Sequence, residues 1–163
     1  MAPGGLHSIK MRPYISRAEA LIMFQAVIPY NYTVGIERAD IDAMGHVNNA
    51  SYLKWVQAAI VSHWERLAPA EAVTKHLWVA LKHEITYRKP AFLEDDVVAT
   101  VLLKKVYGAR AFYEIVIRRG ETVLAEVKSS WCCLDAETHR PARLSASIIE
   151  RFLSKMITES QAV

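Results

Sequence analysis

The chain is short of cysteine, having only two, Cys132 and Cys133, which are adjacent. Two neighbouring cysteines provide neither a disulfide framework nor a metal-binding spacing. Consecutive side chains of a strand point to opposite faces, so we expect one cysteine to be buried and the other turned outward. Both are expected to remain thiols that pack as small apolar groups.

Long apolar runs and a strong charge imbalance are also missing. No apolar segment approaches the roughly 18 residues that span a bilayer, and the N-terminal region lacks the layout of a secretory signal. The net charge is +3 over 163 residues, and the basic residues are spread out, which does not predict a nucleic-acid-binding surface. We therefore expect a one-domain cytoplasmic protein with no nucleic-acid or membrane partner.

The apolar pattern changes along the chain from helical to alternating. Residues 1–27 are expected to form an N-terminal arm, in which a capping-box pattern predicts a short helix over 17–26. Within a domain over 28–154, the expected elements are a strand at 30–38, a helix at about 50–67, strands at 77–87, 96–106, 111–118 and 122–134, and a helix at about 145–154. A C-terminal tail over 155–163 follows. This order predicts an α+β fold in which an antiparallel sheet curves around the long helix.

Two carboxylates stand just before the expected long helix. The segment 39–47 has turn chemistry, and Asn48 or Asn49 offers a helix N-cap. A helix N-terminus presents unpaired N–H groups that can hold an oxyanion, while a nearby carboxylate attacks an acyl carbon or activates water. An aspartate in this place is also a common turn or cap residue. The residues alone leave both roles open for Asp42, whereas Asp40 fits a turn residue better.

His46 and the pair Arg88-Lys89 are further candidates. His46 has no serine or cysteine nucleophile nearby and only Asp42 as an evident acidic neighbour, so it could place a substrate or polarise a carbonyl. The basic pair ends a strand and could contact phosphates, although a solvated strand end also explains it. His63 falls on the apolar side of the helix and is expected in the core. The histidines show no metal-ligand spacing, so no metal site is predicted.

One segment carries a family resemblance: Asp40-Ile41-Asp42-Ala43-Met44-Gly45-His46-Val47-Asn48-Asn49-Ala50-Ser51-Tyr52-Leu53. It resembles the active-site motif of hotdog acyl-CoA thioesterases of the 4-hydroxybenzoyl-CoA thioesterase type, with Asp-x-Asp, Gly, Asn-Asn and a Tyr-Leu that opens the central helix. Residues 85–91 are similar to the strand-end motif of that family. The resemblance implies a hotdog fold and hydrolysis of acyl-CoA to a free acid and CoA. It also implies a homodimer or homotetramer, and the Val-rich strand at 97–106 suits pairing across a dimer edge.

The resemblance also implies roles for single residues. Asp42 matches the catalytic aspartate, as nucleophile or general base, and the backbone N–H of Asn49 matches the oxyanion donor. Gly45 and His46 match the turn that brings the thioester carbonyl to the helix. The substrate-binding positions are Asn48 and Tyr52 near the acyl group, and Arg88 and Lys89 near the CoA phosphates. No cofactor is implied besides the coenzyme A of the substrate.

Two other functions stay open. Hotdog hydratases and dehydratases use an aspartate and a histidine a few residues apart, as Asp42 and His46 are, although the Asn-Asn-Ala-x-Tyr continuation favours a thioesterase. A non-catalytic acyl-CoA-binding module would hold the same ligand without turnover. The acyl group is not predicted, because core packing explains the large aromatic residues more often than a substrate pocket does.

Overall fold

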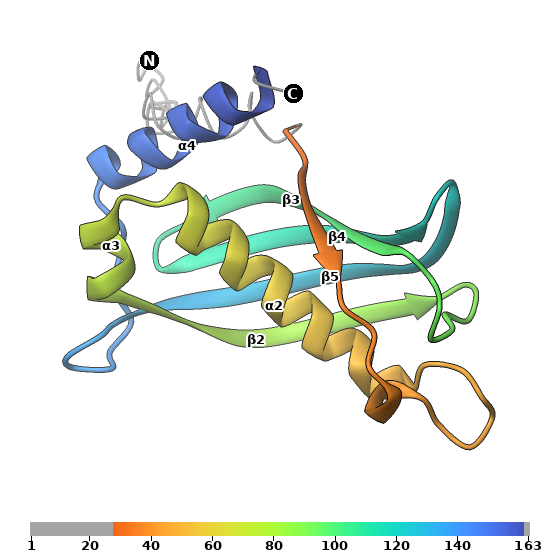
Figure 1. Cartoon of the computed structure of the whole chain (residues 1–163). Helices are drawn as coiled ribbons and strands as arrows, with labels where there is room; N and C mark the ends of the chain where they lie inside the picture. Colours follow the sequence, from red (N-terminus) through yellow and green to blue (C-terminus); the bar gives the residue numbers. More distant parts are fainter. Residues whose placement is uncertain (1–27, 162–163) are drawn as a thin grey trace, which may run out of the picture.

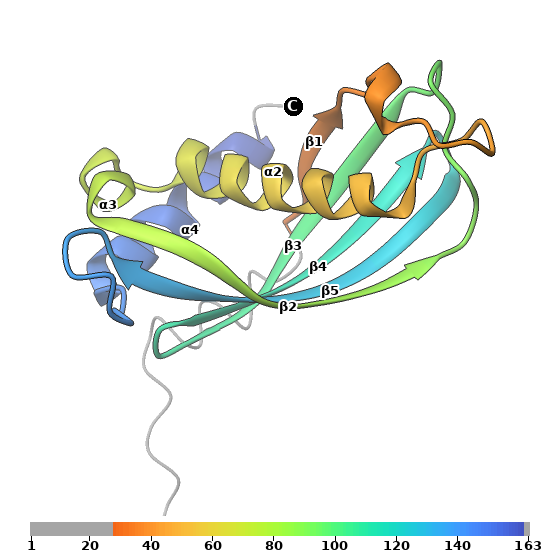
Figure 2. The ribbon, with the colours of Figure 1, turned by 90° about the horizontal axis from the view of Figure 1, so that it is seen from below.

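The computed structural model describes residues 28–161, in which one long helix lies across a five-stranded antiparallel sheet (Figure 1). The elements are β1 (Tyr30–Val34), the 3-10 turn η1 (Arg38–Asp40), α2 (Asn49–Leu67), α3 (Ala70–Lys75), β2 (His76–Tyr87), β3 (Val97–Tyr107), β4 (Arg110–Arg119), β5 (Thr122–Asp135) and α4 (Ala146–Gln161). Seen from a second side, the sheet curves beneath α2 (Figure 2). This α+β arrangement is the hotdog fold that the sequence predicts. The expected arm and its short helix lie outside the described residues.

The strands follow the order β1-β3-β4-β5-β2, with antiparallel pairing throughout. Tight turns connect β3 to β4 and β4 to β5, and each turn contains a glycine with positive φ, Gly108 and Gly120 respectively. β3 lies between β1 and β4 over Val97–Val101, so this half of the strand at 97–106 is not at the sheet edge, and the expectation that the strand pairs across a dimer edge stays a prediction. The long strand with a free side is β2, which pairs with β5 alone.

The core lies between α2 and the face of the sheet that α2 covers. Every second residue is buried there in β3 from Val97 to Leu103 and in β4 from Ala111 to Ile117, because strand side chains alternate between faces. From α2, the buried side chains recur at helical spacing, and they include Tyr52, Trp55, Val56, Ala59 and Ile60. The buried residues of the two strands and those of α2 therefore form one apolar layer.

Three elements differ from the expected bounds. β1 ends at Val34, where Gly35 leads the chain away toward η1. The helix α3 was not expected; it begins directly after Pro69, which ends the extension of α2. The last helix, α4, continues to Gln161. No helix of the described residues is long and apolar enough to cross a membrane.

The two cysteines also depart from expectation. Cys133 faces the core and is 0% exposed, but Cys132 on the opposite face is only 9% exposed, so the expectation of one outward cysteine is wrong. Its cross-strand partners are Val79 on β2 and Arg110 on β4. Burial raises the pKa of the Cys133 thiol to about 12, so it stays protonated at neutral pH.

Candidate functional site

The segment from Asp40 to Asn48 forms a closed loop just before α2. The N–H of Asn48 donates to the carbonyl of Asp40 at 2.8 Å, and the N–H of Asp42 donates to the carbonyl of His46 at 2.9 Å. Gly45 closes the tip with φ of 80°, a conformation that suits glycine best. This geometry fits the role expected of Gly45 as a turn residue, and it brings Asp42 and His46 to one side of the loop tip.

The carboxylate of Asp42 is partly open to solvent. Its Oδ1 accepts a hydrogen bond from the N–H of Met44 at 2.8 Å. Its Oδ2 lies 3.6 Å from Nδ1 of His46, which is too far for a hydrogen bond but close enough for attraction if the imidazole is charged. The same Nδ1 lies 3.3 Å from the carbonyl of Val47. With exposed side-chain fractions of 25% for Asp42 and 27% for His46, both groups remain accessible to a substrate.

The N-terminus of α2 supplies free donors next to this loop. Asn48 is the N-cap, and its Oδ1 accepts from the N–H of Ser51 at 3.1 Å. Within the described residues, no acceptor is found for the N–H groups of Asn49 and Ala50, as is usual for the first residues of a helix. These N–H groups carry partial positive charge and can stabilise an oxyanion. The side-chain oxygen of Asn48 takes part in the cap, and its amide nitrogen has no partner within the described residues.

Asp40 is an internal anchor rather than an exposed turn residue. It is 2% exposed, and its carboxylate accepts from Ser51 Oγ at 2.8 Å, Lys54 Nζ at 2.8 Å and the N–H of Glu37 at 2.9 Å. Burial by itself would raise the pKa of Asp40. The hydrogen bonds from Lys54, Glu37 and Ser51 outweigh burial and hold this pKa below its usual value. Sequence reasoning missed Ser51 and Lys54, although their i, i+3 spacing places them on one face of α2.

A surface pocket joins the loop to the end of β2. It has a volume of about 220 Å³ and is lined by His46, Val47, Asn49, Tyr52, Tyr87, Arg88, Lys89 and Pro90. The hydroxyl of Tyr87 donates to the carbonyl of Asn49 at 2.9 Å, and the ring packs edge-on against Tyr52 at 5.2 Å. Tyr87 thus forms one wall of the site. From the sequence it was expected only as the last residue of a strand, next to the basic pair, and not as a site residue. Of the site residues expected from the sequence, five line this pocket: His46, Asn49, Tyr52, Arg88 and Lys89. Asp42, Gly45 and Asn48 lie in the adjoining loop and are not part of its lining.

The two basic residues of this pocket differ in their surroundings. Nε of Arg88 donates to Oε2 of Glu126 on β5 at 2.8 Å, and Nη2 lies 2.7 Å from the same oxygen in an ion pair. Lys89 is exposed and has no ion pair among the described residues. A phosphate at the pocket would therefore meet a free charge at Lys89 and an engaged one at Arg88. No group of three or more potential metal ligands converges within the described residues.

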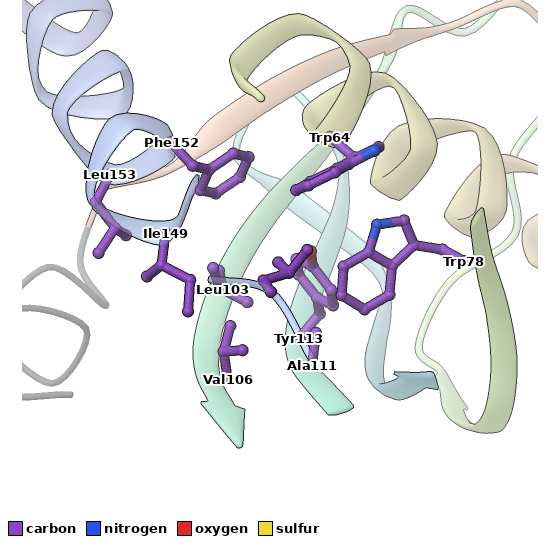
Figure 3. Close-up of a pocket in the computed structure, with 10 residues that line it drawn as sticks. Trp64, Trp78, Leu103, Val106, Ala111, Tyr113, Ile149, Phe152 and Leu153 are labelled. Carbon is purple, nitrogen blue, oxygen red and sulfur yellow. The ribbon is translucent and has the colours of Figure 1, made fainter. Parts of the chain in front are cut away.

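A second pocket lies at the other end of α2, where α4 packs over the sheet (Figure 3). Its volume is only about 20 Å³, and its lining is almost entirely apolar. Trp64 and Trp78 meet edge to face at 5.5 Å on one side, and Phe152 and Leu153 of α4 line the other. This space is a packing gap of the core, consistent with the expectation that large aromatics serve packing.

Comparisons with known proteins agree on fold and family. A family model described as the thioesterase-like superfamily matches residues 36–152. The long-chain acyl-CoA thioesterase FadM of Escherichia coli (strain K12) is 29% identical over 125 residues, covering 72% of this chain and 91% of that protein.

Solved structures show the same architecture. A thioesterase from Thermus thermophilus, complexed with coenzyme A and Zn, matches with a TM-score of 0.65 at 26% identity, covering 75% of this chain and 95% of that one. Slr0204, a 1,4-dihydroxy-2-naphthoyl-CoA thioesterase from Synechocystis, matches with a TM-score of 0.62 at 17% identity, covering 79% and 96%.

Proposed function

Because the chain belongs to the thioesterase-like superfamily, we propose that it hydrolyses acyl-CoA thioesters to a free acid and CoA. The observation that carries this proposal is the pairing of an accessible carboxylate, Asp42, with the free N–H groups at the start of α2. In the proposed reaction, the N–H of Asn49 stabilises the oxyanion of the tetrahedral intermediate. Either Asp42 attacks the thioester carbon, the CoA thiolate leaves and water then hydrolyses the resulting anhydride to free acid and carboxylate, or Asp42 takes a proton from a water that attacks the carbon, and the CoA thiolate leaves.

The test is thiol release from a panel of acyl-CoAs, followed with a thiol-reactive dye. Long-chain acyl-CoAs come first, because the curated relative from Escherichia coli is named for them. Aryl-CoAs come second. Release of one thiol per acid formed is expected. Hydration of an enoyl-CoA without thiol release would instead favour the hydratase, and tight binding without turnover would favour a binding module.

We propose that Lys89 contacts the phosphates of CoA. Lys89→Glu is expected to raise KM for an acyl-CoA by about tenfold at low salt, because it replaces one attractive charge by a repulsive one. The measurement compares the acyl-CoA with the same acyl group on N-acetylcysteamine, which has no phosphates. KM for the truncated ester should not change. An equal effect on both esters would contradict phosphate contact.

We also propose a homodimer formed along the free side of β2. Three apolar side chains of β2 are solvent-exposed although large: Leu77 at 46%, Val79 at 44% and Leu81 at 49%. A long, apolar edge strand is prone to pair with another chain. Pairing of two β2 strands in a two-fold dimer would continue the sheet and cover these residues.

The dimer is tested with Val79→Asp, in which a charge is placed at the proposed interface. Wild type is expected to have the mass of two or four chains by light scattering after gel filtration, and the variant a smaller mass. Tyr107→Asp is the matched control, since Tyr107 is 65% exposed at the tip of the β3–β4 hairpin, away from β2. A single-chain mass for wild type, or equal effects of both variants, would contradict the proposal.

A further inference from the structure

We propose that Asp40 is a positioning residue for the catalytic loop, acting through a hydrogen-bonded triangle with Asn48 and Ser51, here named the loop clamp. This inference rests on the proposed thioesterase function for its effect on rate. Its effect on the loop itself can be measured without any substrate. Asp40 does not face the pocket and is not proposed to touch the reacting atoms.

The loop clamp is a closed ring of three contacts. The carbonyl of Asp40 accepts from the N–H of Asn48 at 2.8 Å. Oδ1 of Asn48 accepts from the N–H of Ser51 at 3.1 Å, and Oγ of Ser51 donates to Oδ1 of Asp40 at 2.8 Å. Asp40 begins the loop, Asn48 ends it, and Ser51 lies in the first turn of α2. The ring therefore fixes both ends of the loop to the helix.

Two further donors hold the carboxylate of Asp40 in place. The N–H of Glu37 donates to Oδ2, and Nζ of Lys54, one turn along α2, donates to Oδ1. Asp40 is 2% exposed and Ser51 is 6% exposed, so water does not compete freely for their contact. Hydrogen bonds to a buried, ionised carboxylate are stronger than neutral ones.

Both halves of the proposed catalytic apparatus depend on the loop clamp. Asp42 follows Asp40 by two residues, and the free N–H groups of Asn49 and Ala50 lie between Asn48 and Ser51. A change at Asp40 would therefore alter the position of the carboxylate relative to these donors. Misplacement by about 1 Å can cost about 10²-fold in rate, because a reacting group must be held in an attacking geometry.

The experiment compares Asp40→Asn, Ser51→Ala and Ser51→Thr. We expect kcat to fall about 10- to 100-fold in Asp40→Asn and about tenfold in Ser51→Ala, with KM nearly unchanged. Ser51→Thr keeps the hydroxyl and should stay within about threefold of wild type. If the loop clamp only stabilised the fold, the melting temperature would fall while kcat, measured well below it, stayed constant.

Asp135→Asn is the matched control. Asp135 also accepts three hydrogen bonds, from the N–H groups of Glu137 and Thr138 and from the Thr138 hydroxyl. It pairs with His76 at the end of β2 opposite to Tyr87, so its loss should leave kcat unchanged.

Amide hydrogen exchange of residues 41–48 supplies a readout that needs no activity. Exchange there should speed up in Asp40→Asn but not in Asp135→Asn. Unchanged exchange, or full kcat in a folded Asp40→Asn protein, would overturn the inference. An inactive wild type would instead reject the proposed function, and with it the effect on rate, while hydrogen exchange would still test the loop clamp.

Discussion

Asp42→Asn is expected to lower kcat for acyl-CoA hydrolysis by about 10³-fold, since the amide neither attacks the thioester nor takes a proton from water. The replacement has nearly the same shape. Its side-chain oxygen can still accept from the N–H of Met44, as Oδ1 of Asp42 does at 2.8 Å. The loop should therefore keep its conformation, and the loss of rate should report the loss of the carboxylate.

The measurement is steady-state thiol release by Asp42→Asn beside wild type, with circular dichroism and thermal melting to check the fold. Binding of CoA, measured by calorimetry, should be retained, because the proposed phosphate contact at Lys89 is separate from the carboxylate. Asp40→Asn should lose less activity than Asp42→Asn, since it changes position and not chemistry. A folded Asp42→Asn protein that keeps more than a tenth of the wild-type kcat would rule out a catalytic role for Asp42.

The second large effect concerns stability in acid and centres on His63. This residue of α2 is 0% exposed, as its place on the apolar helix face predicts. The rings of Tyr30 and Phe152 lie 5.2 Å away, and the ring of Tyr113 lies 5.9 Å away. Neither ring nitrogen has a hydrogen-bond partner among the described residues. Burial lowers the pKa of His63 from 6.5 to about 4, because the charged form loses its hydration.

The direction of the pH effect follows from this lowered pKa. Below pH 6.5 the unfolded chain takes up a proton at His63, whereas the folded chain does so only near pH 4. The contribution of the neutral, buried histidine to the free energy of unfolding is complete above pH 6.5 and is lost as the pH falls toward 4. The free energy of unfolding should drop by about 3 kcal/mol over this range from His63 alone.

His63→Phe tests this effect by removing the titrating group from an aromatic environment. Urea denaturation at pH 7 and pH 4 gives the loss of unfolding free energy for each protein. The loss should be smaller in His63→Phe by about 3 kcal/mol, whatever the repacking costs at pH 7. His139→Gln, which changes an exposed histidine, should show the same loss as wild type. Equal acid losses in wild type and His63→Phe would contradict the assignment to His63.

The sequence by itself determined the local features of this protein. It predicted the five strands, the helices α2 and α4 and their order along the chain, and the cap that starts α2, because short-range periodicity and turn chemistry govern these features. It also placed Asp42, Gly45 and His46 in one loop before the helix, since they are neighbours in the chain. The roles of these residues in catalysis stay predictions for the experiments above.

Only the tertiary structure decided the features that depend on distant residues. In the folded sheet β2 is an edge strand and β3 lies between β1 and β4. The alternation of apolar residues within a strand does not predict this order. Arg88 met Glu126, 38 residues away, which leaves Lys89 as the free charge of the pair. Asp40 has the sequence context of a turn residue, yet folding buried its carboxylate against Ser51 and Lys54. Burial and partners fix the role of a charged group, and both exist only once the chain has folded.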